Sequence, residues 1–223
     1  MWPKVRLLPL LSLVALAEGY TAPLAASKSE LIVPVGAWRV VQRESGPVNY
    51  YTIHRESPLS FIRGEYRPPL KTVVLGFPLP DDERPKIRYM RWKWRAIKLP
   101  AGGNECVESK GDSAAVIYVS WKRFMRWYCI KYVWTTASPR LAVCDKKSNP
   151  FMAQDTVVLE AGGPLNIWRE ESIDLDAEYR KHFAEGDPTA AVPDFMGIAL
   201  MTDGDQNNTS SVGDFADFHL IRR

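Results

Sequence analysis

The sequence lacks the short motifs that mark the commonest catalytic sites. It contains no His-Glu-x-x-His, no Gly-x-Ser-x-Gly and no Walker loop. Its three histidines, His54, His182 and His219, are scattered and show no zinc-binding spacing. Glu170 and Glu171 are adjacent, so on a strand they point to opposite faces and cannot form an acid pair. Support for catalysis is therefore thin, although a glycosidase could still use carboxylates from distant positions.

Cysteine is scarce, with only Cys106, Cys129 and Cys144. No C-x-x-C spacing is present, which argues against a zinc site built on these residues. The odd number leaves at least one thiol over or implies an intermolecular bond. Cys129 lies in an apolar run and is expected to be buried. Hairpin proximity favours Cys129–Cys144 if a disulfide forms, but spacing alone does not decide the connectivity.

Beyond its first residues, the sequence lacks an apolar run long enough to cross a bilayer. The N-terminus itself has the pattern of a signal peptide. Lys4 and Arg6 form a positive region, residues 7–16 are apolar, and Ala15-Leu16-Ala17 is a small-x-small cleavage site. We therefore expect export to the periplasm or the medium, with no membrane-spanning segment after the leader.

These features divide the chain into three predicted parts. The signal peptide covers residues 1–17, with a second candidate cut near residue 26. A polar linker follows over residues 18–30, and residues 31–223 form one domain. A chain of 223 residues supplies one sizeable core but not two comfortable domains.

A large excess of one charge is also missing. The formal net charge is +3, and removal of Lys4 and Arg6 with the leader lowers it to +1. A nearly neutral protein offers no electrostatic argument for nucleic acid as a partner.

Short strands dominate the predicted structure. The chain has 17 Pro and 14 Gly in short clusters, a composition that suits many strands joined by turns. Residues 86–97 alternate cations with tryptophan or alanine, which is typical of a half-buried strand. The other expected strands cover residues 38–41, 49–54, 60–66, 71–77, 114–121, 127–135, 155–160, 195–202 and 215–222, with one more starting at 167–170, and 137–150 is read as a connection.

A single helix is predicted over Leu175–Phe183. Asp174 or Asp176 can cap it, and Lys181 and His182 near its end match the helix dipole. Many strands with one short helix indicate a mostly β protein, a jelly-roll-type β-sandwich.

Six short motifs follow one another along the chain: residues 91–95 (RWKWR), 110–115 (KGDSAA), 130–134 (IKYVW), 154–159 (QDTVVL), 202–206 (TDGDQ) and 214–218 (DFADF). As an ordered set they resemble a bacterial family known as domain of unknown function 3047. The resemblance covers roughly Trp38 to the C-terminus, and the family name assigns no activity. The closing strand also resembles that of galactose-binding-like jelly rolls, which include many carbohydrate-binding modules.

The loop after residue 202 has the spacing of a calcium loop. Asp203, Asp205 and Asn207 offer oxygen atoms at alternate positions, and Asp214 follows eleven residues after the first. Asn208 stands where an EF-hand loop has Gly, and Asp214 where it has Glu. The alternative is a polar hairpin loop whose side chains satisfy turn geometry. No cofactor is required by the sequence, but Ca²⁺ fits this loop.

Aromatic and polar side chains on the strands suggest a saccharide site, because sugars stack on aromatic rings and hydrogen-bond to polar groups. The alternative is that strand tryptophans fill the core. The aromatic candidates are Trp92, Trp94, Tyr118, Tyr128, Tyr132, Trp134 and Trp168. The predicted ligand-binding residues are Arg91, Arg95, Asp112, Lys131, Trp134, Gln154 and Asp203.

Arg91, Lys93 and Arg95 also form a cationic strand face that could bind an anionic group, unless acids lie across from it. The leading hypothesis is an exported, non-enzymatic protein that binds a carbohydrate or a related cell-envelope component. The alternatives are a glycan-acting hydrolase and an envelope scaffold or interaction protein.

Overall fold

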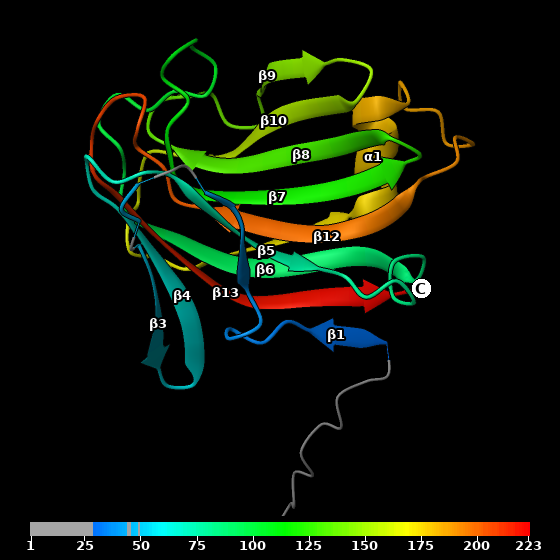
Figure 1. Ribbon diagram of the computed structural model, residues 1–223, viewed down its shortest axis with the longest axis horizontal. Coiled ribbons are helices and arrows are strands. Elements are labelled where there is room, and N and C mark those ends of the chain that lie inside the picture. The colour runs from blue at the N-terminus through cyan, green and yellow to red at the C-terminus, as the bar shows by residue number, and fades with distance from the viewer. Residues whose placement is uncertain (1–28, 44–45, 49) are drawn as a thin grey trace, which may run out of the picture.

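The computed structural model describes residues 29–43, 46–48 and 50–223, which form two sheets and one helix. Figure 1 shows the two sheets packed against each other, with the helix at one end of the layers. The protein is therefore a mostly β, jelly-roll-type sandwich, as predicted.

The six-stranded sheet has the order β11-β6-β13-β4-β3, with β1 also paired to β13. All of its pairings are antiparallel. Its strands are β1 (Glu30–Ile32), β3 (Tyr51–Glu56), β4 (Leu59–Tyr66), β6 (Ile87–Lys98), β11 (Arg169–Asp174) and β13 (Ser211–Arg222).

The seven-stranded sheet has the order β2-β5-β12-β7-β8-β10-β9. Its pairings are antiparallel except that between β8 and β10, which run parallel. Its strands are β2 (Arg39–Arg43), β5 (Val73–Pro78), β7 (Ser113–Arg123), β8 (Arg126–Thr135), β9 (Val143–Ser148), β10 (Met152–Ala161) and β12 (Asp194–Met201).

Aromatic side chains fill the space between the sheets. In β6 the alternation sends Trp92 and Trp94 into the core, as expected from its period of two. Trp94 packs edge to face on Trp134 of the facing sheet, with ring centroids 6.0 Å apart. The other large side chains buried between the sheets include Trp121, Tyr132 and Phe215.

The helix α1 (Leu175–Phe183) has the predicted bounds. Asp174 is its N-cap, and one carboxylate oxygen accepts hydrogen bonds from the backbone N–H groups of Asp176 and Ala177, both at 3.0 Å. Leu175 and Tyr179 are buried on the side facing the sheets. The capping prediction from the sequence is therefore confirmed.

Two predictions about the chain's course are wrong. The stretch 137–150 is not only a connection, because β9 lies within it and pairs with β10. β9 is an exposed edge strand, so its residues lack the apolar alternation that reveals a strand. The disulfide joins Cys106 to Cys144, with their Cα atoms 4.9 Å apart, while Cys129 remains a free thiol.

The predicted signal peptide and nearly all of the predicted linker lie outside the described residues; the last linker residue, Glu30, already belongs to β1. Within the described ranges, no helix has the length and apolar character needed to span a membrane.

The disulfide generates a stability prediction. Its half-cystines are 38 positions apart in the sequence, so it restricts the unfolded chain considerably. Replacing both residues, Cys106→Ala with Cys144→Ala, should lower the free energy of unfolding by about 2–4 kcal/mol, as measured by urea denaturation. Cys129→Ala is the matched control. An equal or smaller loss in the double variant than in the control would contradict the prediction.

Candidate functional site

The outer face of the seven-stranded sheet carries a cavity of about 1120 Å³. Outward side chains of β7, β8, β10 and β12 form its floor, and two loops and β9 form its walls. Its lining includes Tyr118, Ser120, Cys129, Lys131, Met152, Gln154, Ala199 and Met201 on the floor, with Glu105, Glu108, Trp127, Asp145, Lys147, Asp203 and Gln206 around it. We call this space the outer-face cavity.

Strand alternation explains why polar groups face this cavity. In β8, Ile130 and Tyr132 point into the core between the sheets. Cys129 and Lys131 alternate with them and therefore project to the other side, where they line the cavity. The same alternation places Gln154 of β10 beside them, because Gln154 is the register partner of Cys129.

A buried ion pair connects the floor to one wall. The Nζ atom of Lys131 lies 2.9 Å from both carboxylate oxygens of Glu105, and the Ser113 hydroxyl donates to Glu105 at 2.6 Å. All three residues are buried. Burial opposes the charged form of Lys131, but the charge of Glu105 more than offsets it and the pKa of Lys131 is raised. Lys131 therefore remains charged, and the ion pair holds residue 105 against the sheet.

Asp203 is a buried carboxyl group at the edge of the cavity. Burial, and then the neighbouring charge of Asp205, raise its pKa to about 7, while Lys131 acts in the opposite direction. Its Oδ1 atom accepts hydrogen bonds from the backbone N–H of Gly204 at 2.8 Å and the hydroxyl of Thr72 at 3.3 Å. Asp203 thus carries an exchangeable proton near neutral pH.

Asp112 holds the loop that follows Asp203. Its carboxylate accepts from the backbone N–H groups of Gln206 and Asn207 at 3.1 and 2.7 Å, and from the Asn207 amide at 2.7 Å. Gln206 in turn accepts a hydrogen bond from the backbone of Gly111 at 2.9 Å. These hydrogen bonds connect the two walls at one end of the cavity. Asp112 therefore contributes to the cavity by fixing the position of the loop that follows Asp203.

The disulfide fixes the same wall from another direction. Cys106 follows Glu105 directly, and its bond to Cys144 joins this wall to the edge strand β9. The free thiol of Cys129 lies on the floor, where burial raises its pKa to about 12. This thiol therefore stays protonated at neutral pH.

The structure brings three of the predicted ligand-binding residues together. Lys131, Gln154 and Asp203 all line the outer-face cavity, and Tyr118 from the aromatic set lies on its floor. Asp112 is fully buried behind the loop that it holds. These residues come from four separate segments of the chain.

The remaining predicted ligand-binding residues lie elsewhere. Trp134 is in the core, and its indole N–H donates to the backbone oxygen of Gly162 at 2.9 Å. Arg91 and Arg95 belong to β6 of the six-stranded sheet. Arg91 contacts Glu30 at 3.5 Å. These three residues do not share a site with the cavity.

Arg95 belongs to a charge network in the six-stranded sheet. It donates to Asp214 at 2.7 Å and to Glu56 at 2.9 Å, and its guanidinium stacks 4.4 Å above the ring of Trp168. Arg63 reaches the other oxygen of Asp214 at 2.7 Å. The cationic face is thus neutralised by acids, which was the alternative that the sequence left open.

The predicted metal ligands are also divided. Asp203 and Asp205 do lie together, and with Asp112 they can place oxygens within 4.8 Å of one another. Asn207 is engaged by Asp112, and Asp214 pairs with two arginines in the other sheet. The four residues predicted from the loop pattern therefore do not converge on one point. Asp112, and not Asn207 or Asp214, lies together with Asp203 and Asp205.

Of the other aromatic candidates, Trp92, Trp94 and Tyr132 are buried in the core. Tyr128 packs against Tyr179 of α1, with ring centroids 5.3 Å apart. Core packing thus accounts for most of the set, as the alternative interpretation held.

Sequence reasoning missed Glu105, Trp127 and Lys147, all of which line the cavity. A signal for Glu105 was present. Lys131 stands in an otherwise apolar stretch of β8, and a buried lysine requires a carboxylate partner. Nothing in the local sequence shows that this partner comes from the loop at residue 105.

The fold resembles that of two solved glycan-degrading proteins, at low sequence identity. One is the xyloglucanase domain of NopAA, a type three effector from Sinorhizobium fredii, in complex with cellobiose; identity is 9%, coverage 86% of this chain and 97% of that chain, and the TM-score 0.47. The other is Endoglucanase 3 from Trichoderma harzianum, of family GH12, at 9% identity, 86% and 94% coverage and a TM-score of 0.46. No curated protein matches the chain.

A family model matches residues 72–219, which is more than half of the chain and includes the cavity floor. Its description is "Protein of unknown function (DUF3047)". The chain belongs to this family.

Proposed function

We propose that the protein is an exported carbohydrate-binding protein whose saccharide ligand lies in the outer-face cavity. Export to the periplasm or the medium is part of the proposal and rests on the leader pattern of residues 1–17. The observation that carries the binding proposal is the cavity itself, a large open space floored by a rigid sheet and lined by polar and aromatic groups.

The floor offers the groups that a polyhydroxylated ligand needs. Lys131 is a donor, Gln154 offers both a donor and an acceptor, and Ser120 contributes a hydroxyl. Gln154 makes no side-chain hydrogen bond to another described residue, so its amide can serve a ligand. These groups sit on neighbouring strands of one sheet, so their spacing is fixed by the strand register.

Apolar contact surface lies beside these polar groups. Tyr118 lies on the floor, and the partly exposed ring of Trp127 lies at the end of the cavity where β8 begins. Sugar rings have apolar C–H faces and polar edges, so a site for them combines aromatic surface with hydrogen-bonding groups. The cavity supplies both over the length of β8 from residue 127 to residue 131.

The charge of the cavity favours a neutral ligand. Lys131 pairs with Glu105, and Lys147 pairs with Asp145 at 2.9 Å. The lining also contains Glu108 and Asp203, so cations are not in excess. A polyanion such as nucleic acid would meet no net positive potential in this space.

A binding prediction follows for Gln154. With a panel of purified neutral oligosaccharides, we expect at least one to raise the unfolding midpoint and to bind measurably by calorimetry. Gln154→Ala should weaken that binding about tenfold, because one hydrogen-bonding group is lost at a fixed position.

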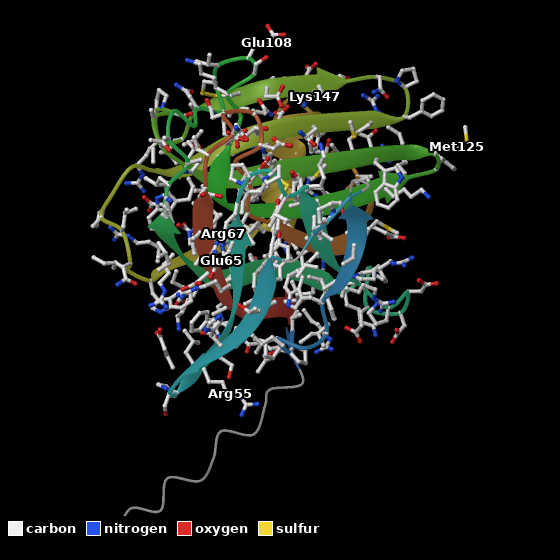
Figure 2. The ribbon with its side chains drawn as sticks, turned by 60° about the vertical axis from the view of Figure 1, so that its left-hand side comes forward. Arg55, Glu65, Arg67, Glu108, Met125 and Lys147 are labelled. Carbon is white, nitrogen blue, oxygen red and sulfur yellow. A yellow bond between two sulfur atoms is a disulfide. The ribbon has the colours of Figure 1, made fainter. Side chains whose placement is uncertain are left out.

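Arg55→Ala serves as the control for this variant. Arg55 is an exposed strand residue at the β3–β4 hairpin, and Figure 2 shows it at the opposite end of the molecule from Glu108 and Lys147 of the cavity. Equal effects of Gln154→Ala and Arg55→Ala, or no binding by any saccharide, would overturn the proposal.

A second candidate function, glycan hydrolysis, is favoured by the two carboxyl groups of the cavity. Asp203 has a pKa of about 7 and can donate a proton, and the carboxylate of Glu105 lies 2.9 Å from the Nζ atom of Lys131. A proton donor and a carboxylate are the two groups that glycosidases use. In this scheme Asp203 protonates the leaving oxygen as the glycosidic C–O bond breaks. Glu105 either forms a bond to the sugar carbon, which water then hydrolyses, or takes a proton from the water molecule that attacks that carbon.

Turnover separates the two functions. If the protein is a hydrolase, reducing ends appear when it is incubated with the saccharide that it binds. Asp203→Asn should then lower the rate by about a hundredfold or more while leaving affinity within about twofold, because a general acid contributes to the rate rather than to ground-state binding. Absence of reducing ends with a saccharide that binds would leave the non-enzymatic function.

The raised pKa of Asp203 predicts a pH dependence of stability. The folded pKa of about 7 exceeds the value of about 3.9 for an unfolded aspartate, so the folded protein holds this proton more tightly. The stabilising contribution is complete below about pH 4 and is lost as the pH rises through about 7. Asp203→Asn retains the acceptor for the backbone N–H of Gly204. The unfolding midpoint of this variant, relative to that of the wild type, should therefore increase as the pH rises.

Thermal unfolding at a series of pH values checks this prediction, and calcium chloride provides a further arm. A Ca²⁺ ion held by Asp112, Asp203 and Asp205 would raise the midpoint of the wild type above pH 7 but not that of Asp203→Asn. A difference between the two proteins that does not change with pH would show that Asp203 is already ionised in the folded state.

A further inference from the structure

Two adjacent turns present exposed apolar side chains at one end of the seven-stranded sheet. The β7–β8 turn carries Phe124 and Met125, and the β9–β10 turn carries Phe151. The turns lie side by side because the backbone N–H of Trp127 donates to the backbone oxygen of Phe151 at 2.8 Å. Figure 2 shows Met125 projecting from the body of the protein at this end. We call Phe124, Met125, Trp127 and Phe151 the apolar tip.

The fold makes little use of these side chains. Phe124 is 93% exposed, Met125 74% and Phe151 63%, so their surfaces stay in water. Phe124 has a φ of 54°, in the left-handed region where hairpin turns normally place glycine or asparagine. Neither core packing nor turn geometry therefore accounts for a phenylalanine at this position.

Cations flank the apolar tip. Lys122, Arg123 and Arg126 surround the β7–β8 turn, and none of them forms a salt bridge with another described residue. The Nζ atom of Lys122 lies 5.0 Å from the centre of the Trp127 ring. Asp194 is opposite Lys122 in the strand register and is the acid that the register places nearest, without an ion pair. Three cations thus stand around the turn against this one acid of the strand register.

We propose that the apolar tip docks the protein onto the surface of an anionic lipid bilayer. Phe124, Met125 and Phe151 enter the boundary between head groups and acyl chains, where burial of apolar surface is favourable. Trp127 lies at head-group level, as amphipathic aromatic rings do at membrane interfaces. The three cations remain at the surface and contact anionic head groups.

The tip also lies at one end of the outer-face cavity. Trp127 belongs to both, and Met152, next to Phe151, is on the cavity floor. Docking therefore holds this end of the cavity at the membrane surface, where an envelope glycolipid or a surface glycan would be within reach. The docking surface does not depend on the proposed function, since its residues bind lipid whether or not the cavity binds a saccharide.

A fluorescent probe at the tip tests the proposal in the full chain. Met125→Cys is labelled with an environment-sensitive dye in the absence of reductant, so that the Cys106–Cys144 disulfide stays intact. The wild-type protein, treated with the same dye, gives the background signal from labelling of the free thiol of Cys129. Leu141→Cys is the matched control. Leu141 is 73% exposed and follows the far end of β8, about 30 Å from the tip by strand length.

We expect vesicles containing phosphatidylglycerol to shift the dye emission to the blue at residue 125 and not at residue 141. Vesicles of phosphatidylcholine alone should give a much weaker shift, and added salt should reduce the shift because it screens the cations. Phe124→Ser with Phe151→Ser, in the labelled protein, should weaken vesicle binding about tenfold or more, since two apolar anchors are lost. Both residues are exposed, so the unfolding midpoint should not change.

Three results would overturn the proposal. The first is no shift at residue 125, or equal shifts at residues 125 and 141, which would place the vesicle contact elsewhere on the chain. The second is an equal shift with neutral and anionic vesicles, which would deny a role to the cations. The third is a shift that appears without vesicles as protein concentration rises, which would show that a second copy of the chain covers the tip.

Discussion

The packing of large aromatic side chains between the two sheets is the constraint on which the rest of the structure depends. Trp92 and Trp94 of one sheet meet Tyr132 and Trp134 of the other, with centroid separations of 5.7 to 6.0 Å along the chain of contacts. Because these rings must point inward, the alternate residues of the same strands must point outward. The outward set therefore includes Lys131 in one sheet and the cations of β6 in the other.

The cations on the two outward faces are neutralised in different ways. On the six-stranded sheet, Asp214 is shared by Arg63 and Arg95, and stacking of Arg95 on Trp168 closes the face. On the seven-stranded sheet, Glu105 reaches Lys131 from a loop, so the counter-charge comes from above the sheet. A loop that must stand over the floor leaves space beside it, and that space is the outer-face cavity. The ion pair and the cavity thus have one cause.

The sequence predicted most of the fold because its signals are local. Period-two alternation marked β6, and the cap at Asp174 marked α1. The site depended on non-local facts. Asp203 and Lys131 were found from loop and strand patterns, but Glu105 and the disulfide partner of Cys144 are set by how loops fold over a sheet, which no local pattern encodes. For the same reason the prediction that Arg95 binds a ligand was wrong. The sequence pattern of a cation on a strand face is the same whether that cation contacts a ligand or an acid.

The outer-face cavity and the apolar tip are both built on strand β8. Strand β8 runs from Trp127 at the tip to Lys131 at the ion pair, and its register with β7 and β10 keeps the two ends at a fixed separation. One end carries exposed apolar groups among cations, and the other carries acids, with Asp112 and Asp205 beside Asp203. An anionic surface attracts the first end and repels the second. The distribution of charge therefore orients the protein at such a surface with the tip toward it and the acidic end of the cavity in solution.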